Sequence, residues 1–341
     1  MVSAPNVQFV LLVRPLLRVF ESRHRMICRA ASPSSIRSIA GAALTLCVLA
    51  PVGFSAHAHT VAGDSPIPEL VRVAVKGAGA FGRDVEMLTE VFRPPGHGPF
   101  PVVVYSHGRP EQYVDRVKLN APVPRGHVRY WVRKGFAVVA SIRPGYGDTG
   151  GIDREDSGVH YDVFGNCTGH PAFSEPARNA AVAVRATLEW ARAQKWAAAQ
   201  QILLVGQSMG ALATIAAAAD NPPGVIGYIS FAGGAGGNPT RSPGRSCGAE
   251  AMSTFMAEFG RTTRVPNLWL YAENDLYWGQ DAPRAWHAAY AKGGSPTQLV
   301  ITVPVPNADG HQLLLRGGKL WSVHTDRFVE GLGLSAAQPS H

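Results

Sequence analysis

Residues 202–219 read Ile-Leu-Leu-Val-Gly-Gln-Ser-Met-Gly-Ala-Leu-Ala-Thr-Ile-Ala-Ala-Ala-Ala, and they set the architecture to expect. The apolar run at 202–205 predicts a strand, and the alanine-rich end predicts a helix over 208–219. A Gly-x-Ser-x-Gly pentapeptide centred on Ser208 joins the two. In such a strand–turn–helix setting the serine occupies a sharp, strained turn, and the amino terminus of the helix favours negative charge beside it. The pattern therefore predicts a nucleophilic hydroxyl at Ser208.

Strand-like and helix-like patterns alternate along the rest of the chain. Apolar or alternating runs predict strands at 71–75, 85–92, 99–106, 136–142, 202–205, 225–231, 266–271 and 298–303. Apolar residues at helical spacing predict helices at 174–194, 208–219, 282–291 and 319–331. This alternation implies the α/β class, with a mostly parallel eight-stranded sheet covered by helices on both faces. Sites in such sheets lie at the carboxyl ends of the strands.

A serine nucleophile needs a histidine as base and an acid to orient that histidine, and the expected chain order is serine, acid, histidine. Four histidines follow Ser208. His287 and His324 fall inside predicted helices, and His341 ends the chain. His311 instead stands in a turn-rich loop after the last expected strand, which makes it the predicted base.

The acid is expected directly after the strand at 266–271. Glu273 and Asp275 both lie there. Asp275 is the preferred acid because a loop a few residues beyond the strand can turn its carboxylate toward the histidine. Glu273 remains the alternative, and Asp309 is expected to serve as a turn residue that uses its side chain locally.

Acyl transfer also requires two N–H donors for the oxyanion. We expect them to be the backbone N–H groups of Met209, directly after the nucleophile, and Arg109, in the loop after the third strand. Gly108 permits the turn in that loop, and Pro110 holds Arg109 extended. His107 precedes the nucleophile in the chain, and we expect it to support the loop.

Four segments, 106–108, 206–210, 271–275 and 309–311, together resemble the α/β-hydrolase superfamily. The chain is most similar to bacterial dienelactone-hydrolase-like and prolyl-oligopeptidase-like serine esterases, over about residues 70–335. The resemblance implies the α/β-hydrolase fold. Dienelactone hydrolases proper use a cysteine nucleophile where this chain has Ser208, so lactone specificity does not carry over. The propeller of prolyl oligopeptidases has no counterpart segment, which argues against peptidase activity.

Two long segments, 145–173 and 232–265, are expected to be irregular and to overhang the site as a small cap. Each holds one cysteine, Cys167 or Cys247, and an even pair in an exported protein favours a disulfide between them over two separate thiols. Three aromatic residues near strand ends are expected to line the acyl or alcohol pocket, namely Tyr146, Tyr277 and Trp278.

No metal or cofactor is expected. The histidines and cysteines lack zinc spacing, and the glycine-rich run at 231–237 lacks the Lys-Ser/Thr ending of a phosphate-binding loop.

The first 58 residues predict an N-terminal extension with a signal peptide. An apolar stretch at 38–55 follows Arg29 and Arg37 and ends at Ala56-His57-Ala58, the small-x-small form that signal peptidase accepts. An uncleaved anchor is the alternative. Because a segment starting at Met26 has ordinary signal-peptide proportions, we hypothesise that translation starts there. Residues 59–341 are then a single domain in the periplasm or outside the cell, with no membrane anchor.

The charge of the chain does not favour a nucleic-acid partner. The net charge is +8, but residues 1–58 hold six of the 32 basic residues and one of the 24 acidic ones. The remainder carries a net charge of +3, which requires no polyanionic partner.

Together these patterns predict a secreted serine hydrolase that cleaves a carboxylic ester through an acyl-enzyme, with Ser208, Asp275 and His311 as its triad. The expected partner is a small-molecule ester, and nothing in the sequence indicates an oligomeric state. An acyltransferase or a peptidase would use the same triad, and a catalytically inactive binding protein is the alternative of another class.

Overall fold

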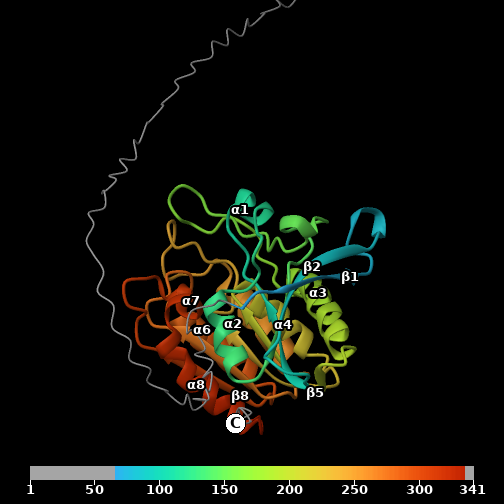
Figure 1. Ribbon diagram of the computed structural model, residues 1–341. Coiled ribbons are helices and arrows are strands. Elements are labelled where there is room, and N and C mark those ends of the chain that lie inside the picture. The colour runs from blue at the N-terminus through green and yellow to red at the C-terminus, as the bar shows by residue number, and fades with distance from the viewer. Residues whose placement is uncertain (1–65, 335–341) are drawn as a thin grey trace, which may run out of the picture. The chain divides into compact units, whose positions relative to one another are not determined.

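The computed structural model describes residues 66–334 (Figure 1). The predicted signal peptide within 1–58, the hypothesised start at Met26 and the terminal His341 lie outside the described residues. Among residues 66–334, no helix is both long enough and apolar enough to cross a membrane.

A single eight-stranded sheet organises the described chain. Its strands are β1 (Glu69–Val75), β2 (Val85–Phe92), β3 (Phe100–Ser106), β4 (Ala137–Ser141), β5 (Ala197–Gln207), β6 (Val225–Phe231), β7 (Asn267–Ala272) and β8 (Thr297–Thr302). All eight lie where the apolar and alternating runs predict them. The largest difference is β5, which begins five residues before the apolar run at 202–205.

The order of the strands across the sheet is β1-β2-β4-β3-β5-β6-β7-β8. β2 pairs antiparallel with both β1 and β4, and every other pairing is parallel. The pairs Ser106↔Gly206 and Gln207↔Phe231 bring the carboxyl ends of β3, β5 and β6 to one edge. The fold class predicted from the sequence, a mostly parallel sheet, is confirmed.

The helices are α1 (Tyr113–Val117), α2 (Arg125–Arg133), α3 (Ser174–Arg192), α4 (Met209–Ala218), α5 (Ala249–Gly260), α6 (Asp281–Ala291), α7 (Leu313–Arg316) and α8 (Gly318–Gly331), with short 3-10 turns η1 (Ala80–Gly82), η2 (Gly147–Thr149) and η3 (Gly310–Gln312). The four helices expected from the sequence correspond to α3, α4, α6 and α8.

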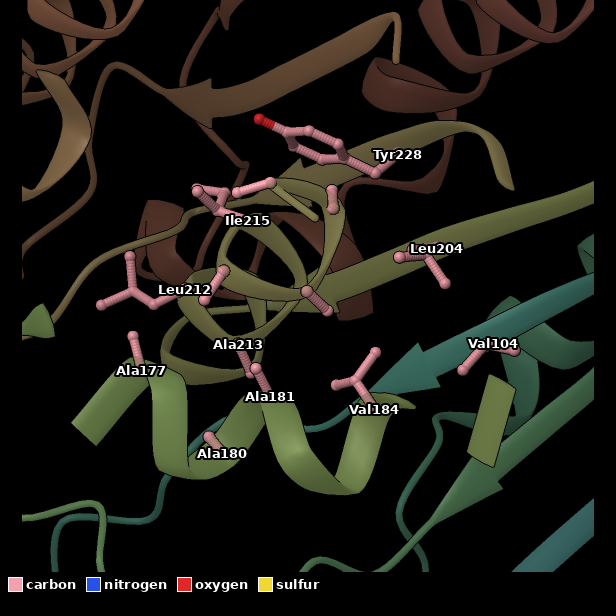
Figure 2. Close-up of a cluster of buried hydrophobic side chains, with 14 of the residues drawn as sticks. Val104, Ala177, Ala180, Ala181, Val184, Leu204, Leu212, Ala213, Ile215 and Tyr228 are labelled. Carbon is pink, nitrogen blue, oxygen red and sulfur yellow. The ribbon is translucent and has the colours of Figure 1, made fainter. Parts of the chain in front are cut away.

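Helices cover both faces of the sheet. Neighbouring residues of a strand point to opposite faces and therefore pack against different helices. Val104 of β3 packs in one cluster with α3, α4, α5 and α6, whereas its neighbour Val103 packs in another with α2, α7 and α8. In Figure 2, Ala177 and Ala181 of α3 face Leu212 and Ala213 of α4, and Val184 of α3 lies beside Val104 of β3. Alanines at these positions let two helices pack closely on one another and on the sheet.

One expectation needs correction. The segment 232–265, expected to be irregular, contains the helix α5. Its residues Met252, Phe255, Met256 and Phe259 are buried at helical spacing. The glycine-rich and proline-containing part of the segment, before Ala249, is irregular as expected.

Candidate active site

Ser208 stands at the turn between β5 and α4. Its backbone has φ 56° and ψ −124°, a strained conformation for a residue with a side chain. Its N–H donates to the carbonyl oxygen of Phe231 at 2.9 Å, which ties the turn to the neighbouring strand β6. The turn requires glycine on both sides. A Cβ at Gly206 would lie 2.3 Å from the oxygen of Gly210, and one at Gly210 would lie 2.2 Å from the oxygen of Ser106.

Two backbone N–H groups beside Ser208 have no acceptor within the described chain. They belong to Met209, the first residue of α4, and to Arg109 in the loop after β3. This loop runs directly against the serine, since a Cβ on Gly108 would lie 3.4 Å from the Cβ of Ser208 and 2.9 Å from the Gln207 side chain. Unpaired donors next to a strained serine are what a developing oxyanion requires.

His311 and Asp275 form the second part of the site. The Nδ1 atom of His311 lies 3.2 Å from Oδ2 of Asp275, whose side chain is fully buried. The other carboxylate oxygen accepts from the N–H groups of Tyr277 at 2.8 Å and Trp278 at 3.2 Å. Glu273, the alternative acid, is exposed. The structure thus brings Asp275 to the imidazole and leaves Glu273 at the surface.

The imidazole of His311 is held on several sides. Asp309 caps the turn η3 by accepting from the N–H of His311 at 2.9 Å, and it also accepts from Leu276 at 2.9 Å. The ring of Tyr277 stacks on the imidazole with centroids 4.0 Å apart, and Trp278 meets it edge-on at 5.3 Å. Asp309 therefore has the local turn role expected of it.

Ser208 and His311 line one cavity of about 470 Å³. Within the described chain, no hydrogen bond joins the hydroxyl of Ser208 to the imidazole of His311. Catalytic hydrogen bonds are often long in the absence of a ligand and tighten when substrate binds. Both residues therefore line the same space.

His107 supports the loop that carries Arg109. Its Nδ1–H donates to the oxygen of Gly108 at 2.7 Å, and its Nε2 accepts from the N–H of Arg143 at 3.1 Å. Burial, together with the nearby Arg143 charge, lowers the pKa of His107 well below its ordinary value. The ring therefore stays neutral, which lets one nitrogen donate while the other accepts.

A buried ion pair that the sequence analysis did not identify lies behind this loop. Arg143 and Glu155 form two hydrogen bonds of 2.6 and 2.8 Å, and both side chains are almost fully buried. Arg143 also donates to Ser106 Oγ at 3.0 Å and to the oxygen of His107 at 2.5 Å. The guanidinium thus fixes the end of β3 from which the Arg109 loop departs.

Tyr146, which we expected to line the pocket, is fully buried behind it. Burial and the charge of Glu155 raise the pKa of Tyr146, so its hydroxyl keeps its proton and donates to Glu155 at 2.6 Å. The same hydroxyl accepts from Arg109 at 2.9 Å. Tyr146 therefore positions the loop, whereas Tyr277 and Trp278 do line a cavity beside Ser208.

That second cavity, of about 260 Å³, opens on the Met209 side of Ser208. Arg109 and Arg116 reach it, and both form ion pairs with Asp153, at 2.6 and 3.3 Å.

A disulfide joins Cys167 to Cys247 next to this cavity, which confirms the pairing expected from the sequence. The hydroxyl of Tyr161 donates to the oxygen of Gly236 at 2.5 Å and accepts from the N–H of Cys247 at 3.0 Å. Since Gly236 lines the cavity, these links tie the loop before α3 to the wall of the cavity.

Among residues 66–334, no group of three or more His, Cys, Asp or Glu side chains is arranged to hold a metal ion.

No protein-family model and no curated protein matches the sequence. The solved structures that it resembles include an esterase from Pyrococcus furiosus, with a TM-score of 0.51 and 12% identity over 79% of this chain and 92% of that one. Two peptidases are also similar. A puromycin-hydrolyzing peptidase from Mycobacterium tuberculosis has a TM-score of 0.53 and 16% identity over 80% of this chain and 41% of that one. An acylaminoacyl peptidase from Pyrococcus horikoshii has a TM-score of 0.51 and 14% identity over 82% and 43%.

This chain spans less than half of each peptidase. At these identities the likeness extends to the fold, which is the α/β-hydrolase fold, as the sequence resemblance implied.

Proposed function

We propose that this chain is a serine hydrolase that cleaves carboxylic esters, with Ser208 as the nucleophile. One observation carries the proposal: a strained serine with two unpaired N–H donors beside it shares a cavity with a histidine that is bonded to a buried carboxylate. Each of these features is unfavourable or unneeded for folding alone. Together they are the parts that acyl transfer requires.

The proposed reaction follows from these contacts. His311 takes the proton of Ser208 as the hydroxyl oxygen attacks the ester carbonyl, and Asp275 stabilises the imidazolium that forms. The N–H groups of Met209 and Arg109 hold the oxyanion. The imidazolium then protonates the leaving alcohol, and a water molecule activated by His311 releases the acid from the acyl-enzyme.

Labelling and mutation of Ser208 test this function. Mass spectrometry after treatment with a fluorophosphonate should find the label on Ser208, and Ser208→Ala should lower kcat toward p-nitrophenyl esters by about 10⁴-fold or more. Ser253→Ala, on α5, is the matched control and should keep full activity. Ester hydrolysis that survives in Ser208→Ala, or a label elsewhere, would contradict the proposal.

The same assay separates the related activities. Matched anilides test the amide cleavage suggested by the peptidases among the similar structures, and product analysis with added alcohol tests acyl transfer. Preference for the anilides, or for transfer over hydrolysis, would replace the ester hydrolase with the corresponding alternative. Absence of both labelling and turnover would favour the inactive binding protein.

We also propose that the protein is exported. The leader within residues 1–58 supports this, and so does the disulfide Cys167–Cys247, because such bonds persist in oxidising compartments. Mass spectrometry of protein from the periplasm or medium should find a mature chain beginning at His59. Retention of residues 38–58 in that protein would contradict export by signal cleavage, and a precursor peptide from residues 1–25 would refute a start at Met26.

A further inference from the structure

Two cavities meet at Ser208. The His311-side cavity, of about 470 Å³, contains His311 and Leu315, whereas the Met209-side cavity, of about 260 Å³, contains Met209 and Trp278 but not His311. Both include Ser208, Tyr277 and residues 109–111. An ester bound at Ser208 therefore has two separate spaces for its two halves.

The chemistry of ester cleavage decides which half enters which space. In the tetrahedral intermediate the carbonyl carbon carries the serine oxygen, the oxyanion, the leaving oxygen and the acyl group. The oxyanion must face the N–H groups of Met209 and Arg109, and the leaving oxygen must lie within reach of His311, which protonates it. The alcohol therefore extends into the His311-side cavity, and the acyl group takes the remaining direction, into the Met209-side cavity.

The walls of the two cavities differ in chemistry. Apart from its catalytic end, the shared Glu111, and Arg125, which is paired with Glu90, the His311-side cavity has a mostly apolar wall. This wall is made of Leu119, Ala121, Pro122, Val123, Pro124 and Leu315. The Met209-side cavity shares Arg109 and Glu111 with the other cavity and has three further charged residues in its own wall: Arg116, Glu155 and Asp156. An apolar wall favours an apolar group, and a polar wall favours groups that can form hydrogen bonds.

The charges around the Met209-side cavity nearly cancel. Arg109 and Arg116 are countered by Asp153, and Glu155 is countered by Arg143. Glu111 and Asp156 are exposed, and Glu111 accepts a hydrogen bond from Asn238 at 2.7 Å. A wall with donors and acceptors but little net charge suits a neutral polar group better than an ion.

The Met209-side cavity is also the smaller of the two, with about 260 Å³ against about 470 Å³. Gly236 forms part of its wall. The carbonyl oxygen of Gly236 accepts hydrogen bonds from Tyr161 and from the N–H of Cys247, which the disulfide joins to Cys167 in the loop before α3. A long acyl chain would have to displace this cross-linked segment.

On the basis of the proposed ester hydrolysis, we infer that the substrates are esters of a short, hydrogen-bonding acid with a larger apolar alcohol. The Met209-side cavity selects the acid, and the His311-side cavity selects the alcohol.

A pair of isomeric esters tests the assignment directly. Naphthylmethyl acetate and methyl naphthylacetate contain the same atoms, but the bulky ring belongs to the alcohol in the first and to the acid in the second. Each kcat/KM is divided by the rate of hydroxide hydrolysis to remove differences in intrinsic reactivity. We expect naphthylmethyl acetate to be preferred by about tenfold or more. Equal rates or the reverse preference would overturn the assignment.

A matched pair of variants tests the same assignment by changing the cavity walls instead of the substrate. Ala121→Phe narrows the His311-side cavity and should lower the preference for naphthylmethyl acetate, whereas Ala235→Phe narrows the Met209-side cavity and should raise it. Fluorophosphonate labelling confirms that each variant is folded at Ser208. Shifts in the opposite directions, or no shift in either variant, would overturn the assignment even if the wild-type preference holds.

The nature of the acid is tested with naphthylmethyl glycolate and naphthylmethyl propanoate, whose acyl groups differ by a hydroxyl in place of a methyl. After the same correction, the glycolate should be cleaved faster, and a preference for propanoate would remove the hydrogen-bonding acid from the inference. Failure of the protein to cleave any of these esters, or to be labelled at Ser208, would instead contradict the proposed function and the inference with it.

Discussion

Two regions of the molecule meet at Ser208, and different interactions stabilise each of them. The scaffold, consisting of the sheet with α2, α3, α4 and α8, buries a set of apolar side chains on each face. The cover, consisting of residues 143–173 and 232–248, is tied by a few specific links, chiefly Arg143–Glu155 and Cys167–Cys247. In the scaffold many other apolar contacts remain when one contact is lost. In the cover we expect the loss of one link to loosen the segment that it ties beside the serine.

The strongest test of this contrast is Glu155→Gln, which leaves the buried guanidinium of Arg143 without its counter-charge. Breaking a buried pair in this way should lower the free energy of unfolding by about 3–5 kcal/mol. Because Arg143 also fixes Ser106 and His107, kcat should fall as well. Urea denaturation and ester turnover measure the two effects.

The control for Glu155→Gln is Glu69→Gln, which removes an exposed pair with Arg93 and should change stability by less than about 1 kcal/mol. Equal effects of the two substitutions would show that burial of the Arg143–Glu155 pair is energetically unimportant.

The disulfide is the second link of the cover. It closes a loop with a sequence separation of 80 residues, and its removal in Cys167→Ser/Cys247→Ser should lower the free energy of unfolding by about 2–4 kcal/mol. The double variant should also accept larger acyl groups, because the wall of the Met209-side cavity at Gly236 is then held less firmly. Treatment of the wild-type protein with a reductant should reproduce both changes. An unchanged acyl preference in the double variant would mean that the disulfide does not limit the cavity.

The scaffold has a pH-dependent weakness of its own at His127 on α2. Burial lowers the pKa of His127 to about 3, whereas an unfolded histidine titrates near 6.5. The unfolded chain therefore binds the extra proton, so stability is fully present above about pH 6.5. Below that pH, stability falls by about 1.4 kcal/mol per pH unit for this residue.

His127→Phe should reduce the loss of unfolding free energy between pH 6.5 and 5 by about 2 kcal/mol. The indole N–H of Trp131 donates to Nε2 of His127 at 2.9 Å and loses this acceptor in the variant. Because this loss lowers stability at every pH, the comparison is made on the change of unfolding free energy with pH and not on its absolute value. Identical slopes for the two proteins, measured by urea denaturation at each pH, would rule out His127 as a source of acid sensitivity.

The smallest expected effect comes from shortening one buried side chain of the scaffold. Ile215→Val, in the cluster drawn in Figure 2, removes one methyl group from a fully buried side chain and should lower the free energy of unfolding by about 1 kcal/mol. Because Ile215 lies away from both cavities, kcat/KM should be unchanged. A loss of activity without a larger loss of stability would show that the scaffold and the site are less separable than the contrast implies.

The scaffold could be predicted from the sequence because its signals are local. Each strand is an apolar or alternating run, and the pentapeptide around Ser208 marks the turn between β5 and α4. The helix α5 carried a usable signal too, in the helical spacing of Met252 and Phe259. That signal was missed because the glycine-rich segment before it suggests a loop. The helix α2 was missed although Trp131 and Val128 mark its buried face, because the helix is short and rich in charge.

The residues of the site also fall into a group that could be predicted from the sequence and a group that could not. Ser208, His311 and Asp275 follow from motif order and strand ends, and the structure brings the last two into contact. The pair Arg143–Glu155 could not be predicted, because a charged residue in a loop does not reveal which of many opposite charges will be buried with it. Tyr146 shows the same limit: position near a strand end cannot tell whether an aromatic ring faces the cavity or the protein behind it.

The backbone at Ser208 sets stability against activity at a single position. At φ 56° a residue without a side chain is under less strain, so Ser208→Gly relieves part of a cost of about 1–3 kcal/mol. Selection for folding alone would therefore favour glycine there. The Ser208→Gly protein should therefore be harder to unfold than the wild-type protein, while it lacks the hydroxyl on which the proposed hydrolysis depends.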